Sequence, residues 1–376
     1  MKILLLAERF GHGHLKAAQN LQKALLNLVP TLEVEVLSTL GLIDPKIENF
    51  AADLYLKILN HTPEIWGFLY EKGHDKEKDH LRWVVALLYK KKLQEIVKDY
   101  QPDGIINTHA FPAIALDYLG YKNYATVITD YDYHAFWLTK NSRFYYVAAE
   151  KIRNRLLDKG FTANQVLAFG PPVDPIFTKP LAEDTIRKEY NIPATDKIIL
   201  IMGGGLGLGP IAEVASLLAK VDKKWTVISL CGHNQKLYQK LKAFEGKNLI
   251  PVPFTSRVPH FLKAANIVLT KPGGLSTAEA LALGKPIFIL NPLPGQEERN
   301  AKFLVESGAA LYIKDVGELV LKIKEAFLPE NYQRLSQNAL RLGHKDAAFN
   351  IARHFLQYFG ETIFGGDIYG ENYVSS

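Results

Sequence analysis

The chain is poor in cysteine and has no long apolar run. Cys231 is the one cysteine among its 376 residues, which excludes an intramolecular disulfide and a cysteine-rich metal site. No stretch approaches the roughly 20 apolar residues of a membrane-spanning helix. The apolar run after Met1 meets a charge at Glu8, too early for a signal peptide. We therefore expect a cytoplasmic protein, either free or peripheral on the inner face of the cell membrane.

The net charge of the chain is also small. The chain has 45 Lys and Arg against 39 Asp and Glu, a net charge of +6. Residues 1–177 hold 21 basic and 20 acidic side chains, so no single basic domain emerges and we expect no nucleic-acid partner. A hydrophobic fraction of 48% with 22% charged residues is typical of a folded globular protein. The length indicates two domains.

Short apolar runs alternate with helical patterns in both halves of the chain. A strand is expected in the opening residues before the turn at 10–14, and the other runs expected to be strands are 32–37, 104–107, 125–129, 144–148, 197–202, 226–231, 267–270 and 286–290. Helices are expected between them, for example over 15–28 and 150–159. This alternation predicts an α/β protein whose parallel sheets are covered by helices on both faces.

A proline-rich segment separates the two halves. Residues 170–180 contain four prolines, which prevent regular structure and stiffen a connection. We therefore predict an N-terminal domain over 1–172 and a C-terminal domain over 173–343. The final helix, over 344–362, has an apolar face and is expected to pack back toward the N-terminal domain; its members are Ala348, Ile351, Ala352, Phe355 and Phe359.

Three glycine-bearing loops, at 11–14, 203–209 and 273–274, each follow an expected strand and open an expected helix. Because helix N-termini at the carboxyl ends of parallel strands bind phosphate, the loops predict an anionic ligand held between the domains. The second loop also fits GxGxxA over 207–212. However, no acidic residue ends the next strand, which disfavours a dinucleotide fold, and no GK[ST] follows, which excludes a P-loop. Tight-turn glycines without a ligand remain the alternative.

The third loop carries side chains suited to a nucleotide. Gly273, Gly274 and the Ser276 hydroxyl could bind a diphosphate, and Glu279, one turn further on, could accept both hydroxyls of a ribose. A capping serine with a first-turn glutamate explains the spacing equally well. Beyond it, the prolines of 291–300 place Gln296 and Glu297 at a loop end, where paired donors and acceptors suit sugar hydroxyls; a solvated helix start is the alternative.

The first half offers a possible general base. His14 stands beside glycines at a helix N-terminus, which lowers an imidazole pKa and favours the neutral form that a base requires. A capping or loop histidine is the alternative, and His12 is equivalent by residue type. Residues 130–132 spell DxD, which some glycosyltransferases use to hold a metal with a nucleotide. Because this DxD lies far from the second and third glycine loops, we expect Asp130 on the acceptor side and no metal.

A basic amphipathic segment follows at 80–98. It joins Leu81, Val84, Val85 and Leu88 to the lysines at 90–92, with Trp83 and Tyr89 alongside. Such a helix can lie on anionic lipid, or it can pack on the core with its lysines in water. The aromatic residues expected to insert shallowly into a bilayer are Tyr55, Trp66, Phe68, Tyr70 and Trp83.

Two motifs in the second half are specific. They are TKPGGLSTAEA at 270–280 and NPLPGQEERNA at 291–301, supported by GHGH at 11–14, THAFP at 108–112, Thr129 and Asp130 with His134 and Trp137, and CGHN at 231–234. With these motifs the chain resembles, from about Lys2 to Phe359, the lipid-sugar branch of glycosyltransferase family 28. That branch contains monogalactosyldiacylglycerol synthases and processive diacylglycerol glucosyltransferases.

The resemblance implies a GT-B fold, with two Rossmann-like domains facing a cleft, and no cofactor. The N-terminal domain would bind 1,2-diacylglycerol and the C-terminal domain a UDP-sugar, giving a β-glycoside by inversion. His14 would be the base, assisted by Asp130. The donor residues it implies are Gly13, Gly203, Gly204, Gly205, Phe254, Val258, Gly273, Gly274, Ser276, Glu279, Gln296 and Glu297. On the acceptor and membrane side it implies Trp66, Trp83 and Trp137.

Two residues depart from the family pattern. His12 stands where relatives have Gly or Asn, and Ser256 stands where relatives often have an acidic residue. Three alternatives stay open: a UDP-sugar 2-epimerase, a transferase acting on a polyprenyl-linked acceptor, and a non-catalytic nucleotide-sugar sensor that would not need His14. Nothing in the residues chooses between glucose and galactose, between one addition and several, or between oligomeric states.

Overall fold

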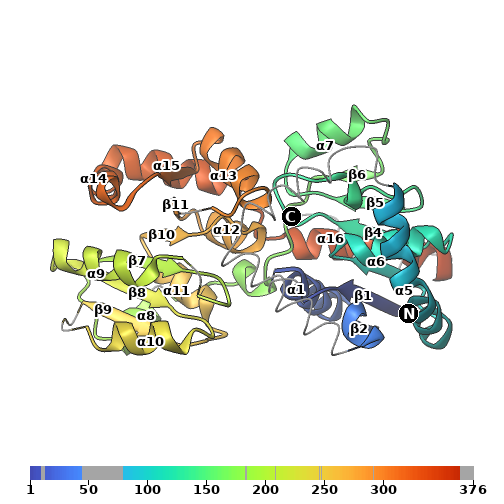
Figure 1. The fold of residues 1–376 in the computed structure, drawn as a ribbon, viewed down its shortest axis with the longest axis horizontal. Helices are drawn as coiled ribbons and strands as arrows, with labels where there is room; N and C mark the ends of the chain where they lie inside the picture. The colour runs from blue at the N-terminus through green and yellow to red at the C-terminus, as the bar shows by residue number, and fades with distance from the viewer. Residues whose placement is uncertain are drawn as a thin grey trace. The chain divides into compact units, whose positions relative to one another are not determined.

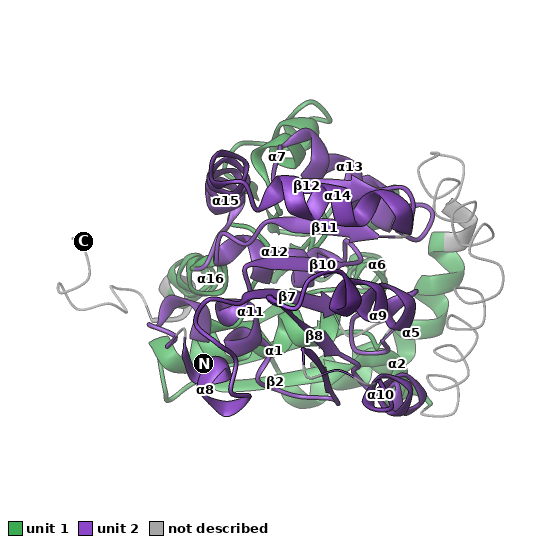
Figure 2. Ribbon diagram, turned by 90° about the vertical axis from the view of Figure 1, so that its left-hand side faces the viewer, with its two compact units in different colours: residues 1–175, 346–376 green, residues 176–345 purple. Residues whose placement is uncertain are grey.

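The computed structural model describes residues 1–9, 13–44, 79–182, 184–207, 209–244, 246, 248–290 and 292–364. Two compact units make up the chain (Figure 2). The first unit contains Met1–Pro175 and Asp346–Ser376, and the second contains Ile176–Lys345. The chain thus passes between the units three residues beyond the boundary expected at 172, and the C-terminal helix is part of the first unit. Five residues singled out in the sequence lie outside the described residues: His12, Tyr55, Trp66, Phe68 and Tyr70.

The first unit has a six-stranded parallel sheet in the order β2-β1-β3-β4-β5-β6 (Figure 1). Its strands are β1 (Lys2–Ala7), β2 (Glu33–Ser38), β3 (Gly104–Asn107), β4 (Tyr124–Val127), β5 (Phe144–Tyr146) and β6 (Val166–Leu167). Alternate residues of a strand face opposite sides of the sheet, so each face has its own core. Leu5 and Ile106 lie in one core, and Leu4 and Ile105 lie in the other.

Helices cover both faces of this sheet. They are α1 (Gly13–Leu28), α2 (Thr39–Ile43), α5 (Asp79–Tyr100), α6 (Ala110–Tyr118), η1 (Ala135–Trp137), α7 (Glu150–Leu157) and α16 (Ala347–Phe364), with η2 (Pro175–Thr178) at the junction. The apolar face of α16 packs with α1 on the Leu5 side of the sheet. A Cβ atom on Gly104 would come within 2.7 Å of Phe355, so this glycine lets α16 lie directly on β3.

The end of the first unit is fixed to α1. The Asp174 carboxylate forms ion pairs with Lys16 and Lys23, at 3.5 and 2.6 Å. The side-chain amide of Asn20, which is fully buried, donates to the Pro172 carbonyl at 2.9 Å. The proline-rich segment therefore leaves the first unit from a defined position on α1.

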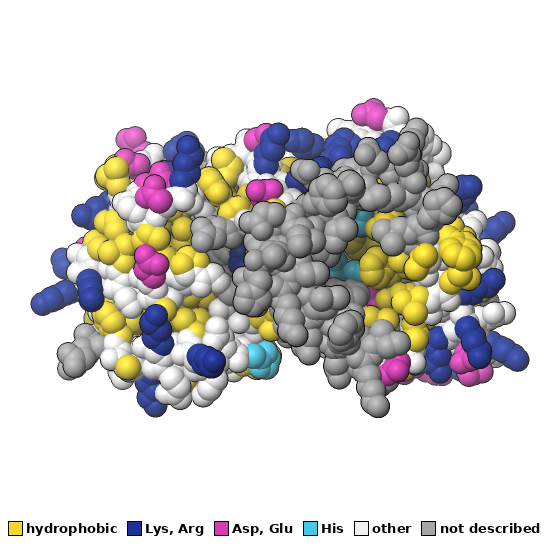
Figure 3. Space-filling view, in the orientation of Figure 1, with side chains coloured by type: hydrophobic (Ala, Val, Ile, Leu, Met, Phe, Trp, Pro, Cys, Tyr) yellow, Lys and Arg dark blue, Asp and Glu magenta, His cyan; other side chains and the backbone are white. Residues whose placement is uncertain are grey.

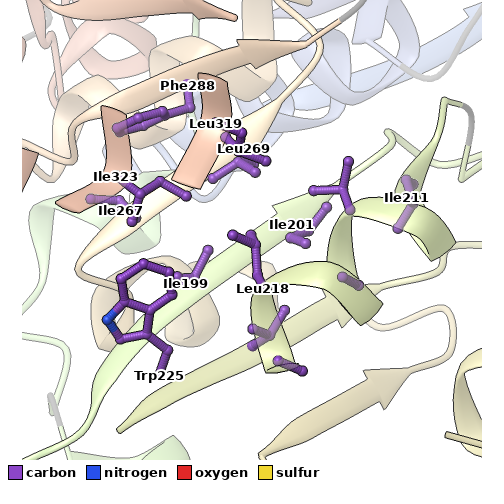
Figure 4. Close-up of a cluster of buried hydrophobic side chains, with 14 of the residues drawn as sticks. Ile199, Ile201, Ile211, Leu218, Trp225, Ile267, Leu269, Phe288, Leu319 and Ile323 are labelled. Carbon is purple, nitrogen blue, oxygen red and sulfur yellow. The ribbon is translucent and has the colours of Figure 1, made fainter. Parts of the chain in front are cut away.

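The second unit has another six-stranded parallel sheet, in the order β12-β11-β10-β7-β8-β9. Its strands are β7 (Lys197–Met202), β8 (Trp225–Leu230), β9 (Leu249–Val252), β10 (Ile267–Thr270), β11 (Ile287–Leu290) and β12 (Ala310–Ile313). Its helices are α8 (Asp184–Glu189), α9 (Ile211–Val221), α10 (Gln235–Lys242), α11 (Val258–Ala264), α12 (Gly274–Ala282), α13 (Gln296–Glu306), α14 (Val316–Ala326) and α15 (Pro329–Leu342). Figure 4 shows one core, where Leu218 of α9 meets Ile199, Ile201 and Trp225 of the sheet.

The expected α/β class with parallel sheets is confirmed in both units. Strands β3, β7 and β10 have the bounds expected from the sequence, whereas β6, β9 and β12 were not expected at all. Each of these three lies at the edge of a sheet. Among the helices of the described part of the chain, none is long and apolar enough to cross a membrane.

Candidate active site

The strand order places a switch point in each sheet. In the first unit the chain reverses its direction of winding between β1 and β3, and in the second unit it does so between β7 and β10. Open parallel sheets bind ligands outside the carboxyl ends of the strands at such points. In the first unit the described residues at this edge are 8–9 after β1, 13–14 at the start of α1 and 108–109 after β3. In the second unit they are 203–207 and 209–210 after β7 and 271–273 after β10. The candidate base and donor residues lie on these segments, on the first two turns of the helices that follow them, or after neighbouring strands.

His14 lies across the first switch point from Thr108. Its ring Nδ1 is 2.7 Å from the Thr108 carbonyl oxygen, and the Thr108 hydroxyl donates to the His14 carbonyl at 2.9 Å. Because a carbonyl oxygen can only accept, Nδ1 carries the ring proton, and Nε2 has the lone pair. The α1 N-terminus and the end of β3 thus hold His14 in the tautomer of a general base.

The surroundings of His14 favour the neutral ring. Burial lowers its pKa below the ordinary value of 6.5, while the charge of Asp130 and the bond to Thr108 oppose part of that decrease. Asp130 is itself buried, just beyond the end of β4. A lowered pKa keeps the imidazole unprotonated at neutral pH.

Two further histidines lie near His14 around Trp137. The His14 and His109 rings meet edge to face with centroids 4.8 Å apart, and the rings of His14, His109 and His134 all lie 6.0–6.1 Å from Trp137. We call these four residues the histidine cluster. Trp137 is 3% exposed, so of the joint acceptor and membrane role expected for it, the bilayer contact is excluded and the place on the acceptor side stays a prediction.

His109 has the opposite tautomer to His14. Its Nδ1 accepts a hydrogen bond from the Phe111 backbone N–H at 3.3 Å as the cap of α6, so Nε2 carries the proton. Burial, together with His14 and His134, holds the pKa of His109 well below its usual value. His134 caps η1 in the same way, through the Phe136 N–H. The cluster therefore places one ring acceptor beside two ring donors. Residue type alone did not identify His109, which entered only as part of the THAFP motif.

The acidic side chains of the first switch point have protein partners. Asp132, the second acid of the DxD pattern, forms an ion pair with Arg155, whose guanidinium lies 4.6 Å from the centre of the Tyr133 ring. Glu8 is fully buried and accepts from the Thr39 hydroxyl and the Leu40 N–H at the start of α2. Within the described ranges, no group of three or more His, Cys, Asp or Glu side chains is placed to hold a metal ion.

In the second unit, different constraints explain why glycine occurs at different positions of the glycine loops. Gly207 has a φ of +58°, and a Cβ atom there would lie 2.4 Å from the Cys231 carbonyl. The tight-turn alternative therefore explains Gly207, and it also accounts for Gly204, whose φ is +69°. Gly203, Gly204 and Gly205 stay predicted ligand contacts. A Cβ atom on Gly273, by contrast, would meet nothing within 4 Å, so packing does not require a glycine at this position of the third loop.

The start of α12 has no side-chain cap. Gly273 is its N-cap, and Ser276 is the third residue of the helix rather than a capping serine. The Thr277 hydroxyl donates backward to the Gly273 carbonyl at 2.8 Å, so it does not cap the helix either. The alternative of a capping serine with a first-turn glutamate is therefore wrong. Glu279 is buried on the second turn of the same helix.

An ion pair joins the loops after β10 and β11. Lys271 Nζ lies 2.8 Å from one carboxylate oxygen of Glu297, whose other oxygen accepts from the Leu293 N–H at 2.9 Å. The Lys271 Cε atom also lies 3.9 Å from where a Cβ on Gly204 would stand. Sequence reasoning named Glu297 but missed Lys271, because the two are 26 residues apart in the chain. Gln296, half-buried, begins α13 beside them.

An exposed aromatic surface lies beyond β8 and β9. The Phe254 ring is 55% exposed and stacks on His233, with centroids 4.1 Å apart and planes 17° apart. Val258 begins α11 four residues later. A flat aromatic pair at this place suits a planar base, which is consistent with the role expected for Phe254 and Val258.

Helix α5 has one buried face and one exposed apolar face. Ala86, Tyr89 and Leu93 are buried, so Tyr89 belongs to the core. The exposed apolar residues are Trp83, Val84, Leu87 and Leu88, each 47–52% exposed. We call these four the docking face; Figure 3 shows hydrophobic side chains gathered over the part of the first unit where α5 lies in Figure 1. Lys90 and Lys91 are exposed one turn further on.

Comparison with known families decides the class of protein. Residues 14–173 match the family model of monogalactosyldiacylglycerol (MGDG) synthase, and residues 198–352 match that of the glycosyltransferase family 28 C-terminal domain. The chain is 30% identical over 346 residues to the processive diacylglycerol beta-glucosyltransferase of Bacillus cereus (strain AH187), covering 89% of this chain and 87% of the relative. The chain belongs to the MGDG synthase branch of glycosyltransferase family 28. It is also 29% identical over 350 residues to the enzyme of the same name from Bacillus subtilis (strain 168), covering 90% of each.

Solved structures show the same fold at low identity. The UDP-GlcNAc 2-epimerase of Neisseria meningitidis bound to UDP-GlcNAc has a TM-score of 0.59, with 18% identity, covering 95% of this chain and 100% of that one. The calicheamicin glycosyltransferase CalG4 has a TM-score of 0.61, with 13% identity, covering 95% and 98%. The GT-B fold and the family resemblance are thus confirmed. Because both an epimerase and a transferase have this fold, the fold alone does not identify the enzyme class. The family match does.

The His14 environment makes a titration prediction that needs no substrate. We expect NMR of the ring nitrogens to give His14 a pKa below 6.5, with Nδ1 protonated in the neutral form. In Asp130→Asn the pKa should fall further, because the carboxylate that favours the imidazolium is removed while burial remains. A His14 pKa unchanged or raised in Asp130→Asn would contradict this arrangement.

Proposed function

We propose that this glycosyltransferase moves a hexose, glucose or galactose, from a UDP-sugar to 1,2-diacylglycerol. The product is a β-glycosyldiacylglycerol, formed with inversion at the anomeric carbon. The names of the relatives support the acceptor, and the observation that carries the chemistry is the His14–Thr108 hydrogen bond. That bond leaves Nε2 of a half-buried, neutral imidazole as a proton acceptor.

An alcohol attacks an anomeric carbon only as its proton leaves. The pKa of a diacylglycerol hydroxyl is far above 7, so a positioned base is needed, and His14 Nε2 takes the proton in this proposal. Asp130 stabilises the imidazolium that forms, since its charge already favours that form. General-base catalysis of this kind contributes about 10²–10⁴-fold to a rate.

The leaving group is UDP, and the second unit binds it in this proposal. The uncapped N–H groups at the start of α12, near Gly273 and Gly274, receive the diphosphate, because a helix N-terminus favours negative charge. Ser276 adds a hydroxyl donor, and Glu279 accepts from the ribose. Gln296 and Glu297 contact the sugar, while Phe254 and Val258 receive the uracil. The reaction then requires that His14 reach the anomeric carbon that these residues hold.

A lipid acceptor requires contact with a bilayer surface. We propose that the docking face of α5 inserts shallowly, with Lys90 and Lys91 near anionic headgroups, so that the enzyme is peripheral on the inner face of the cell membrane. Trp83 is the member best suited to the interface, because its ring is amphipathic. An epimerase acting on a water-soluble nucleotide sugar has no use for this exposed apolar surface, which favours the lipid glycosyltransferase.

The reaction itself is tested by product identity. Purified protein is incubated with diacylglycerol liposomes and either UDP-glucose or UDP-galactose, and products are identified by mass and anomeric configuration. We expect a β-linked glycosyldiacylglycerol from one donor. A free epimerised sugar nucleotide with no lipid product would contradict the proposal.

Replacing the base should lower turnover without weakening nucleotide binding. In His14→Ala we expect kcat to fall by about 10²–10⁴-fold, while UDP affinity measured by calorimetry stays unchanged because the diphosphate residues belong to the second unit. His260→Ala, in α11, serves as the histidine control and should retain turnover. Near-normal kcat in His14→Ala would remove this residue from the role.

Glu279 should act on donor binding rather than on the chemical step. A hydrogen bond to a charged group contributes about 1.5–3 kcal/mol, so Glu279→Gln should raise the donor KM by about tenfold or more with a smaller change in kcat. Glu213→Gln, an exposed glutamate in the first turn of α9, is the matched control. A donor KM equal to that of the control would refute the ribose assignment.

The docking face should determine how strongly the protein binds lipid vesicles. Burial of a large apolar side chain contributes about 1.5–3 kcal/mol, so the double variant Trp83→Ser/Leu87→Ser should reduce flotation with phosphatidylcholine/phosphatidylglycerol vesicles by at least about tenfold. Leu321→Ser/Leu340→Ser, which changes two residues 60% and 55% exposed in the second unit, is the control. Equal flotation of both variants, or no dependence on phosphatidylglycerol, would count against this surface.

A further inference from the structure

Arg82 joins α5 to the histidine cluster. Its guanidinium donates to the carbonyl oxygens of Ala135 and Leu138, each at 2.9 Å. These carbonyls belong to the first residue of η1 and to the residue that follows it, so one planar group spans the whole turn. Between them lies Trp137, whose ring contacts the three imidazoles. Arg82 therefore holds the element that positions the centre of the cluster.

A second chain of contacts runs from the same helix to the same cluster. The Tyr89 ring of α5 lies 6.1 Å from Phe111 of α6, and Phe111 lies 4.7 Å from His109, centroid to centroid. His109 in turn meets His14 edge to face. Tyr89 is 1% exposed, so this route runs through the packed interior. Two independent routes thus join α5 to the rings around the proposed base.

Arg82 also precedes the docking face directly in sequence. Trp83 and Val84 are the next two residues, and Leu87 and Leu88 follow one turn later. The docking face and Arg82, which holds η1, therefore lie next to each other on α5. Because a packed helix moves as a rigid element, a displacement of α5 would act on both routes.

We infer that Arg82 is a positioning residue for the histidine cluster, and that it couples the cluster to docking of α5 on a bilayer. The inference rests on the proposed lipid-glycosyltransferase function and deepens it, because it connects lipid contact to catalysis. Arg82 does not touch substrate in this account. It acts through η1 and Trp137 on the placement of His14.

The guanidinium suits this task in a way that other side chains do not. It is planar, always charged and able to donate to two acceptors at once, whereas lysine donates from a single point. Without the two-carbonyl bridge, η1 loses its attachment to α5 and Trp137 is held less firmly over the rings. Water then reaches His14, and the burial that lowers its pKa is reduced. The other titratable groups acting on His14 and His109 are Asp130 and His134.

The test compares the wild-type chain with Arg82→Gln, Arg82→Lys and a control, Arg153→Gln. Arg153 also donates to a backbone carbonyl of the first unit, that of Val166 at 3.0 Å on β6, so its loss matches the chemistry at another place. The acceptor is dioctanoylglycerol, supplied with and without phosphatidylcholine/phosphatidylglycerol vesicles. Four quantities are measured: vesicle cosedimentation, UDP affinity, kcat against pH, and the His14 pKa by NMR.

We expect Arg82→Gln to bind vesicles and UDP as the wild type does, yet to lose about tenfold or more in kcat, since small misplacements of catalytic groups are costly. The acid limb of its kcat–pH profile should move to higher pH, because a less buried His14 stays protonated to a higher pH. Stimulation by vesicles should shrink toward onefold. Arg82→Lys should lie between wild type and Arg82→Gln, and it serves as the test if the glutamine variant fails to fold. Arg153→Gln should match the wild type.

Unchanged kcat, pH profile and vesicle stimulation in both Arg82 variants would overturn the inference. So would a loss of kcat that follows a proportional loss of vesicle binding, because Arg82 would then act on docking alone. If the wild type forms no glycolipid, the proposed function fails by itself. The His14 pKa still decides the inference in that case: a rise in Arg82→Gln but not in Arg153→Gln supports it, and equal values in all variants overturn it.

Discussion

The hydrogen bond between the His14 ring and the Thr108 carbonyl is the constraint on which the first unit's chemistry depends. It joins the start of α1 to the residue that follows β3, and the Thr108 hydroxyl donates a second bond to the His14 carbonyl. Together they fix both where α1 begins and which ring nitrogen is the acceptor. Burial makes the neutral ring the stable form. A surface histidine of the same residue type would have neither property.

Both units use the same topological solution with different chemistry. Each sheet reverses its winding once, and each reversal brings two loops together at the carboxyl ends of neighbouring strands. In the first unit these segments carry the His14 and His109 imidazoles and the buried Glu8 carboxylate, with the Trp137 indole beside them on η1. In the second they carry glycines, an uncapped helix start and a lysine–glutamate pair. The sheet determines where a site can form, and the loop side chains determine what it does.

The amino-acid pattern predicts the interior of each sheet better than its edges. β3, β7 and β10 are buried apolar runs bounded by polar turns, which is a strong strand signal. β6 has two residues and β9 contains Pro251, so neither carries such a signal. Among the candidate site residues, His14 and Glu279 could be predicted from their motifs and positions in the sequence. His109, Lys271 and Arg82 were not, because their partners are distant in the chain and only the folded sheet brings them together.

The Lys271–Glu297 ion pair links two loops that sequence comparison would treat as separate. Exchanging Glu297 for a neutral residue, as an attempt to alter sugar choice would do, also releases a cation beside the glycines after β7. The freed ammonium would then alter the electrostatic potential felt by any anion nearby. Under the proposed donor assignment, a substitution at position 297 would therefore change both the contact with the hexose and the potential near its diphosphate carrier, so a library that varies this position alone would sample both at once.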